Sequence, residues 1–256
     1  MTDESKTRQN WSAAGYGENA RFVSDYGEVL FSLLDDKPNQ RILDLGCGDG
    51  ALAEKLVALG HNVTAVDQSP DFVEAAQAKG LNAFQMDGHA LAFDQPFDCV
   101  FSNAALHWML EPNRVIEGVS RSLVESGVFV GEMGGQNNVA AIVTALLASL
   151  EMEAGLDGRP LHPWYFPSPD GYAALLDAHG FKVEAIELIP RPTPLPTGIS
   201  GWLETFANPF VADLDATARQ AVLARAEALL EPSLMDENGN WTADYVRLRF
   251  KARKDH

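Results

Sequence analysis

The stretch "ILDLGCGDGALAEKL", residues 42–56, places three glycines within five positions, between an apolar run and a helical pattern. The apolar residues before Gly46 are typical of a buried strand, and leucines recur at helical spacing after the loop. Glycine has no β-carbon, so such a turn lets a ligand approach the backbone closely. A merely tight turn would need one glycine rather than three. We therefore expect a ligand-binding loop here.

Strand-like and helix-like segments alternate on both sides of this loop. Residues 69–80, for example, begin with Ser69 as a cap, Pro70 and Asp71, and end at Gly80, as expected of a helix. This alternation predicts an α/β fold, a Rossmann-like doubly wound sheet. Strands are expected at 41–46, 62–67, 82–87, 97–103, 126–133, 181–189 and 242–252.

Three segments, 1–38, 134–167 and 190–240, fall outside this alternation and contain aromatic residues and helical patterning. We interpret them as a cover over the carboxyl edge of the sheet rather than as a separate domain. The expected organisation is a helical cover (1–38), a Rossmann-like ligand-binding core (39–133), a lid insertion (134–167), a continuation of the core (168–189), a second lid insertion (190–240), and the last core strand with its tail (241–256).

The formal net charge is −17, from 36 acidic and 19 basic residues. Such a field repels nucleic acid and anionic membranes, so we expect neither as a partner and favour a small-molecule ligand. The amino terminus lacks the apolar core of a signal peptide, and the two cysteines, Cys47 and Cys99, offer no disulfide framework. A cytoplasmic location is therefore expected.

Acidic residues stand at the expected ends of the first three strands: Asp44, Asp67 and Asp87. A dinucleotide fingerprint, G-x-G-x-x-G/A, fits "GCGDGA" formally. However, a carboxylate at Asp44 would repel a pyrophosphate, whereas it suits the ammonium group of a cationic amino-acid ligand. Asp67 can accept hydrogen bonds from two ribose hydroxyls. The three acids together favour an adenosine-containing, cationic ligand over a dinucleotide.

These motifs resemble those of class I S-adenosylmethionine-dependent methyltransferases. "ILDLGCGDG" is similar to the first motif of that family, "VTAVDQS" to the second, "MDGHALAF" to the third, and "PFDCVFSNAALHW" to the fourth strand and its loop. "SNAALHW" and "PWYFPS" resemble a bacterial branch grouped with trans-aconitate methyltransferases. The resemblance implies a sheet of about seven strands with the last antiparallel and S-adenosyl-L-methionine as the cofactor. We expect no metal site.

The resemblance also implies which residues bind the cofactor. Asp44, Gly46 and Gly48 would line its methionine part, Asp67 its ribose, and Asp87 with Gly88 its adenine; we also expect any β-carbon at Gly46 to clash with the cofactor. The full expected set adds a residue for the cofactor carboxylate, one near the transferable methyl group, and motif neighbours: Arg21, Asp44, Gly46, Cys47, Gly48, Asp67, Gln68, Asp87, Gly88, His89 and Asn103.

Methyl transfer needs a general base when the acceptor is a hydroxyl, but none when it is a carboxylate. His107, in the loop after the fourth strand, is the candidate base, although it could instead simply hydrogen-bond a neighbouring loop. Aromatic residues outside the sheet suggest an apolar or planar acceptor pocket. The expected acceptor-binding residues are Trp11, Tyr16, Trp108, Trp164, Tyr165 and Trp202, and an anionic acceptor could also meet Arg159, Arg191, Arg247 or Arg249.

We therefore expect an enzyme that methylates a small-molecule acceptor, with O-methylation of a carboxylate as the leading hypothesis. The alternatives are O- or N-methylation of an aromatic or amine acceptor, and a catalytically silent cofactor-binding module. A nicotinamide-dependent dehydrogenase is permitted by "GCGDGA", but the sequence lacks its Tyr-x-x-x-Lys arrangement.

Overall fold

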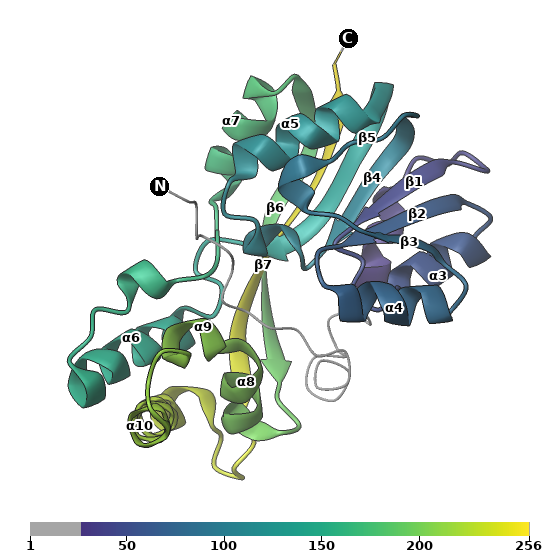
Figure 1. The fold of residues 1–256 in the computed structure, drawn as a ribbon. Helices are drawn as coiled ribbons and strands as arrows, with labels where there is room; N and C mark the ends of the chain where they lie inside the picture. The colour runs from purple at the N-terminus through teal and green to yellow at the C-terminus, as the bar shows by residue number, and fades with distance from the viewer. Residues whose placement is uncertain (1–26, 256) are drawn as a thin grey trace, which may run out of the picture.

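The computed structural model describes residues 27–255, which form a seven-stranded sheet in the order β3-β2-β1-β4-β5-β7-β6 (Figure 1). The first five strands are parallel, and β7 runs antiparallel to both of its neighbours. This confirms the predicted doubly wound sheet with an antiparallel last strand. The strands are β1 (Arg41–Leu45), β2 (Asn62–Asp67), β3 (Asn82–Gln85), β4 (Phe97–Asn103), β5 (Leu123–Gly134), β6 (Phe181–Pro194) and β7 (Thr242–Lys254).

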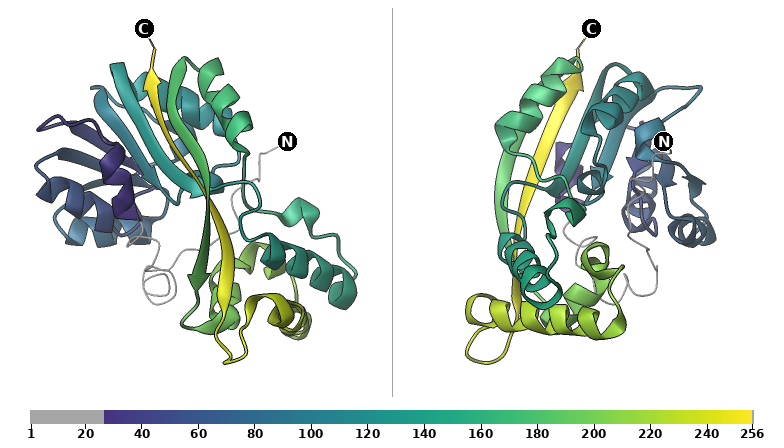
Figure 2. Two further views of the ribbon diagram at one scale, coloured as in Figure 1. Left: turned by 180° about the vertical axis from the view of Figure 1, so that it is seen from behind. Right: turned by 60° about the vertical axis from the view of Figure 1, so that its left-hand side comes forward.

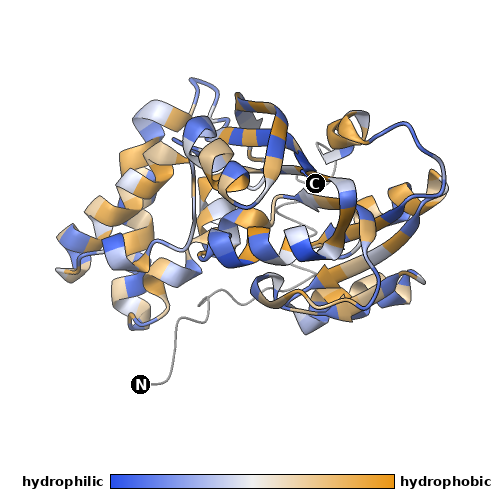
Figure 3. Ribbon diagram, turned by 90° about the horizontal axis from the view of Figure 1, so that it is seen from above, coloured by the Kyte–Doolittle hydropathy of each residue, from blue (hydrophilic) through white to orange (hydrophobic). Residues whose placement is uncertain are grey.

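Helices cover both faces of the sheet, because neighbouring residues of each strand point to opposite sides. In β1, Ile42 packs with the helices α3 (Ala51–Ala58) and α4 (Pro70–Ala78) and with the 3-10 helix η1 (Glu28–Leu33). The next residue, Leu43, packs on the other face with α5 (Pro112–Ser122) and α7 (Pro169–Ala178). Hydrophobic and hydrophilic residues alternate along the helices (Figure 3).

The helix starts follow the sequence patterns. Both Ser-Pro-Asp stretches begin helices, α4 and α7, with the proline in the first turn. Ser168 accepts a hydrogen bond from the backbone N–H of Gly171, whereas Ser69 occupies the cap position of α4 without such a bond. The prediction that Ser69 occupies the cap position is confirmed, although its side chain makes no capping hydrogen bond. Its backbone N–H donates instead to Asp67 Oδ1 at 2.9 Å.

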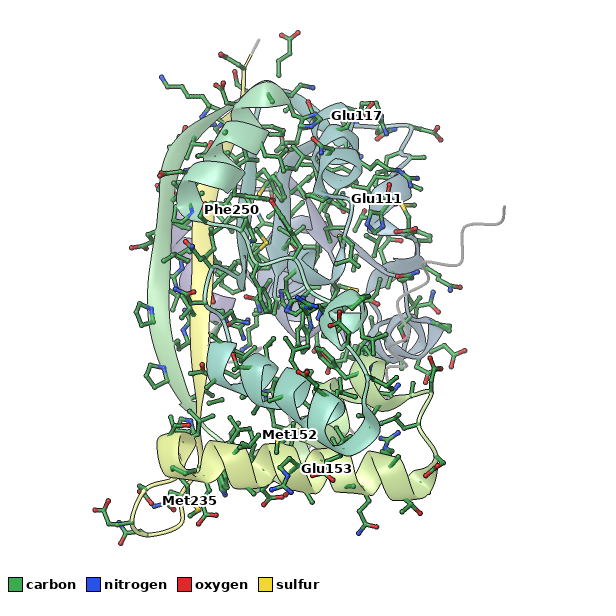
Figure 4. The ribbon with its side chains drawn as sticks, turned by 90° about the vertical axis from the view of Figure 1, so that its left-hand side faces the viewer. Glu111, Glu117, Met152, Glu153, Met235 and Phe250 are labelled. Atoms are coloured by element: carbon green, nitrogen blue, oxygen red, sulfur yellow. The ribbon has the colours of Figure 1, made fainter. Side chains whose placement is uncertain are left out.

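The remaining helices form a lid beside the sheet, which we define as α6 (Ala140–Ala154), α8 (Gly198–Phe206), α9 (Asn208–Val211) and α10 (Ala216–Leu234). These helices share one apolar cluster although they come from two separate segments of the chain. Arg225 of α10 donates to Glu153 of α6 at 2.7 Å, where the two helices run past each other (Figure 4). None of the helices between residues 27 and 255 is long and apolar enough to span a membrane.

The lid is attached to a two-stranded extension of the sheet. β5 pairs with β7 only between Arg247 and Arg253, whereas β6 stays paired with β7 as far as Pro194 and Thr242. We call the paired strands β6 and β7 the hairpin, although helices connect them. The far end of the hairpin leaves the sheet and runs into the lid (Figure 2). Ala243 and Tyr245 of β7 belong to the apolar cluster of the lid.

The β6 strand is longer than the expected 181–189, because it continues through Pro190, Pro192 and Pro194. Proline lacks a backbone N–H and is excluded from central strands, but it is tolerated on an edge strand. β6 is the outermost strand on its side of the sheet. The sequence-based prediction ended the strand too early because the position at the edge was not known.

A buried ion cluster joins the hairpin to the sheet. Glu132 of β5 is 2% exposed, and its carboxylate accepts hydrogen bonds from Arg191 of β6 and Arg249 of β7. Arg249 Nη2 lies 2.8 Å from Glu132 Oε2. Two cations on one buried carboxylate compensate the cost of its desolvation.

Glu132→Gln should lower the free energy of unfolding by about 3–5 kcal/mol, because it leaves two half-buried guanidinium groups without their anion. The matched control is Glu184→Gln, which removes a partly exposed partner of Arg253 and should cost about 1 kcal/mol or less. Urea denaturation of both variants measures the difference. Equal losses in the two variants would contradict a special role for the buried cluster.

Candidate active site

A cavity of about 560 Å³ lies at the carboxyl ends of β1 and β2, where the glycine loop, the loop after β4 and the lid meet. The structure brings most of the residues expected from the sequence into its wall. From the cofactor set these are Asp44, Gly46, Cys47, Gly48, Asp67, Gln68, Asp87, Gly88, His89 and Asn103, and from the others His107, Trp108, Trp164 and Trp202. Trp11, Tyr16 and Arg21 lie outside the described residues.

Tyr165 does not line this cavity. It packs against the apolar cluster under α5 and α7, while its neighbours Trp164 and Phe166 face the cavity. Consecutive residues of an extended segment point in opposite directions, which explains the difference. The expectation that Tyr165 contacts the acceptor is therefore not supported by its position.

The three glycines of the first loop all have positive φ angles, but a β-carbon would meet different surroundings at each of them. A β-carbon at Gly46 would lie 2.2 Å from the β-carbon of Ala105, and one at Gly50 would lie 2.3 Å from Leu81 Cδ1. A β-carbon at Gly48 would meet no atom of the described residues within 4 Å. A β-carbon at Gly46 would thus clash with the loop after β4 even without a ligand, and Gly48 is the glycine that leaves space in the cavity.

Asp87 and Gly88 form the corresponding turn after β3. The carboxylate of Asp87 accepts hydrogen bonds from the backbone N–H of His89 at 2.9 Å and lies 2.7 Å from Nδ1 of the same residue. Burial raises the pKa of Asp87, but these hydrogen bonds outweigh it and leave the pKa below its ordinary value. A β-carbon at Gly88 would lie 2.7 Å from the sulfur of Met109, so this glycine makes room for a methionine that also lines the cavity.

Asp44 and Asp67 lie at the ends of neighbouring strands. Asp67 is held by the backbone N–H groups of Gly48 and Ser69, each at 2.9 Å, although burial raises its pKa. Asp44 is 2% exposed, and its Oδ2 has no hydrogen-bond partner among the described residues. Burial, followed by repulsion from Asp67, raises the pKa of Asp44 to about 7. An orphaned buried carboxylate oxygen of this kind calls for a cationic donor.

His107 lies in a 3-10 turn, η3 (Leu106–Trp108), and is buried. The backbone N–H of Gly134 donates to its Nδ1 at 3.3 Å. Burial, and then the charge of Arg247, lowers the pKa of His107 well below its ordinary value, so the ring is neutral at pH 7. A neutral ring that accepts at Nδ1 carries its proton on Nε2. His107 therefore presents a donor, which is the opposite of what a general base at Nε2 requires.

The arginines suggested for an anionic acceptor fall into three groups. Arg191 and Arg249 hold Glu132, and Arg159 is an exposed residue paired with Asp157. Arg247 of β7 lines the cavity, and its guanidinium lies 4.5 Å from the centre of the Tyr245 ring.

Tyr245, Asn138 and Val139 also line the cavity but were not expected from the sequence. The buried face of β7 changes along the strand. Odd-numbered residues in its first part face the lid, whereas even-numbered residues from Leu248 onward face the core of the sheet. Val139 has a positive φ of 47°, which is rare for a β-branched residue. Its backbone N–H donates to the carbonyl of Asp244, so this strained turn is fastened to β7 beside the cavity.

Comparisons with known proteins identify the family. A family model described as a methyltransferase domain matches residues 43–131. An uncharacterized methyltransferase of Schizosaccharomyces pombe is 38% identical over 96% of this chain and 98% of its own length. A trans-aconitate 2-methyltransferase of Klebsiella pneumoniae is 28% identical over 84% of this chain and 86% of its own. A solved S-adenosylmethionine-dependent methyltransferase from Mesorhizobium loti has a similar fold, with a TM-score of 0.54 at 18% identity, covering 90% of this chain and 98% of that one.

The chain belongs to the class I S-adenosylmethionine-dependent methyltransferases. The cavity fits that cofactor in two respects. Asp44 Oδ2 is a buried acceptor that has no partner within residues 27–255 and is suited to an ammonium group, and the space at Gly48 allows a ligand to approach the backbone. We propose that Asp44 receives the ammonium group, Asp67 the ribose hydroxyls, and Asp87 with His89 the adenine, and that Asn103 faces the methionyl chain.

Gly48→Ala should weaken the binding of S-adenosylmethionine by at least about tenfold, or about 1.4 kcal/mol, because the new methyl group enters the cavity. The matched control is Gly60→Ala. Gly60 also has a positive φ and open space around its α-carbon, but it does not line the cavity. Both variants should lose about 1–2 kcal/mol of stability from backbone strain. Calorimetric titration that shows equal affinity losses in both would remove Gly48 from the binding site.

Asp44 should make cofactor affinity depend on pH. Because its pKa in the ligand-free protein is about 7, the carboxyl group is protonated at lower pH and attracts an ammonium group weakly. The affinity should therefore rise by up to about tenfold per pH unit toward pH 7 and level off above it. In Asp44→Asn this dependence should disappear and the affinity at pH 8 should be lower.

The same pKa has the opposite effect on the stability of the ligand-free protein. Between pH 3.8 and about 7 the carboxyl group of Asp44 is protonated in the native state but ionised in the unfolded state. The free energy of unfolding therefore falls as pH rises through this window. Thermal melts without ligand should show that Asp44→Asn reduces this fall. A wild-type affinity that is independent of pH below 7 would contradict the assignment of Asp44.

Proposed function

We propose that this methyltransferase transfers the methyl group of S-adenosylmethionine to a carboxylate oxygen of a small-molecule acceptor. The observation that carries the proposal is the pair of polar side chains His107 and Arg247 in the cavity wall. Arg247 is a cation, and His107 is a neutral ring with its proton on Nε2. Both groups carry N–H donors, and both side chains line the cavity. A pair of donors suits an anionic acceptor.

When bound, S-adenosylmethionine supplies a methyl group on a sulfonium, whose carbon–sulfur bond breaks with its electrons kept by sulfur as an acceptor lone pair forms the new bond. A carboxylate acceptor has no proton to lose, so the protein needs no general base. The contribution of this chain is then alignment and exclusion of water. Arg247 holds the carboxylate, the Nε2–H of His107 fixes its orientation, and the aromatic lid residues exclude water.

A hydroxyl acceptor would place a different demand on the same site. His107 would have to accept a proton, yet its Nδ1 is engaged by Gly134 and its Nε2 already carries a proton. Burial and Arg247 both disfavour the charged ring that proton transfer would create. The Klebsiella pneumoniae relative is named for a carboxylic acid, trans-aconitate, which agrees with a carboxylate acceptor.

Arg247→Met should raise the Michaelis constant for a carboxylate acceptor by about 10–100-fold, because a hydrogen bond to a charged group is worth about 1.5–3 kcal/mol. kcat should change little, since the lost contact is mainly ground-state binding. Arg247→Lys should recover part of the loss. Steady-state kinetics with detection of the methyl ester and of adenosylhomocysteine measures both constants.

At saturating cofactor, kcat should also be flat between about pH 6 and 8, because the pKa of His107 is well below its ordinary value. His107→Ala should lower kcat only slightly for a carboxylate acceptor. A loss of about 10²–10⁴ in kcat in His107→Ala, together with activity on phenols or alcohols and none on acids, would overturn the proposal and restore His107 as a general base.

A further inference from the structure

The turn between β5 and α6 is fastened to β7 by hydrogen bonds from its backbone and from one side chain. The N–H of Gly135 donates to the carbonyl of Val246 at 3.0 Å, and the N–H of Val139 donates to the carbonyl of Asp244 at 3.0 Å. Between them, Asn138 takes the place of a strand residue, because its Oδ1 accepts from the backbone N–H of Val246 at 2.9 Å. The conformation of the turn is therefore fixed by β7.

These contacts determine which way the side-chain amide of Asn138 faces. An N–H group can only donate, so the amide atom next to the N–H of Val246 must be the oxygen. The nitrogen, Nδ2, lies on the other side, against Gly134, where a β-carbon would be 2.7 Å from it. Asn138 is 4% exposed and lines the cavity. The amide thus holds its two N–H donors on the side of Gly134.

Gly134 joins this amide to His107. Its backbone N–H donates to Nδ1 of His107 at 3.3 Å, and its missing side chain leaves room for the ring of Phe166 as well as for Asn138 Nδ2. His107, Phe166 and Asn138 all line the cavity. The neutral ring of His107 carries its proton on Nε2, because Nδ1 accepts from Gly134. Two side chains with neutral N–H donors therefore contact the same glycine at the cavity wall.

The order of the strands separates these donors from the cofactor half of the cavity, which we define as the strand ends that carry Asp44, Asp67 and Asp87. Those residues follow or end β1, β2 and β3, whereas Asn138 follows β5. In the sheet, β4 lies between β5 and β1. Ligand atoms beside Asn138 therefore belong to the acceptor rather than to the adenosine part of the cofactor.

Building on the proposed function, we infer that Asn138 is a specificity-determining residue whose Nδ2 donates a hydrogen bond to the acceptor carboxylate, beside the Nε2–H of His107. Both groups donate, so the lone pairs of carboxylate oxygens satisfy both of them. A protonated amine would meet the pair with donors only, and buried donors without acceptors are costly. An alcohol can accept from them, but its uncharged oxygen makes weaker hydrogen bonds. Because the turn holds the amide in place before binding, little side-chain freedom is lost when the acceptor binds.

The variant Asn138→Asp separates the two contacts of this side chain. It keeps an oxygen for the N–H of Val246, but it replaces the donor Nδ2 with a second acceptor oxygen and adds a negative charge. Asn138→Ala removes both contacts. Asn137→Asp is the matched control, because Asn137 is exposed, does not line the cavity, and undergoes the same chemical change one residue away.

The probes share one body and differ in the reacting group: trans-cinnamate, cinnamyl alcohol and cinnamylamine. A second acid, trans-aconitate, is included because the Klebsiella pneumoniae relative is named for it. Calorimetry measures the affinity of each probe for protein saturated with adenosylhomocysteine, and steady-state kinetics with mass spectrometry measures methylation. The affinity for S-adenosylmethionine and the melting temperature are measured for every variant.

Wild-type protein should bind and methylate at least one of the acids. Relative to Asn137→Asp, we expect Asn138→Asp to weaken acid binding and to raise the Michaelis constant by about 10–100-fold, as for the loss of a hydrogen bond to a charged group. kcat should change less, since the lost contact is mainly ground-state binding. The melting temperature and the affinity for S-adenosylmethionine should match those of Asn137→Asp. Asn138→Ala should melt at a lower temperature, because Val246 loses its acceptor, yet weaken acid binding no more than Asn138→Asp does.

Equal acid affinities in Asn138→Asp and Asn137→Asp would overturn this inference and leave the proposed carboxylate methylation intact. A loss of S-adenosylmethionine affinity in Asn138→Asp alone would assign Asn138 to the cofactor and overturn the inference as well. So would a loss of acid binding that is larger in Asn138→Ala and follows the melting temperature, since that result indicates a purely structural role. Wild-type protein that binds neither acid, or that methylates only the alcohol or the amine, would overturn both the inference and the proposed function.

Discussion

The arrangement of the sheet and the lid depends on one interaction, the contact of the buried carboxylate of Glu132 with Arg191 and Arg249. It joins the three strands β5, β6 and β7 at the level where the hairpin leaves the sheet. Helices α8, α9 and α10 are inserted between β6 and β7, so their position follows from the direction of that hairpin. Tyr245 and Arg247 stand four and two residues before Arg249 on β7. The same ion cluster therefore lies at the base of the strands that carry helices α8, α9 and α10 and the cationic side chain of the cavity.

Much of the cofactor half could be predicted from the sequence, because it depends on local patterns and one rule of topology. Asp44, Asp67 and Asp87 lie at or just beyond the ends of three parallel strands, and the carboxyl ends of such strands meet at one edge of the sheet. The structure indeed places all three in the wall of one cavity. Residues 42–56 form the expected strand, loop and helix. Here the pattern of neighbouring residues predicts the structure correctly, since a parallel sheet leaves few other positions for these strand ends.

Other features of the site were harder to predict, because they are made by contacts between distant segments. Nothing near Gly46 in the sequence shows that Ala105 fills the space beside it, and nothing near Gly88 shows that Met109 does so. The tautomer of His107 depends on the backbone of Gly134, and its neutrality depends on burial and on Arg247. The role of Tyr245 requires knowing that β7 passes from the sheet into the lid. These facts arise from packing, which single-segment patterns do not encode.

The three prolines of β6 have a consequence for how this chain behaves at high concentration. Pro190, Pro192 and Pro194 alternate along the outermost strand, opposite Val246, Asp244 and Thr242 of β7. Because alternate residues of a strand direct their backbone groups to the same side, and β7 takes the hydrogen bonds of Arg191 and Thr193, the missing N–H groups belong to the outer side. A strand from a second molecule would find carbonyl acceptors there but no donors. The part of this free edge at residues 190–194 is thereby protected from the edge-to-edge pairing that leads to aggregation.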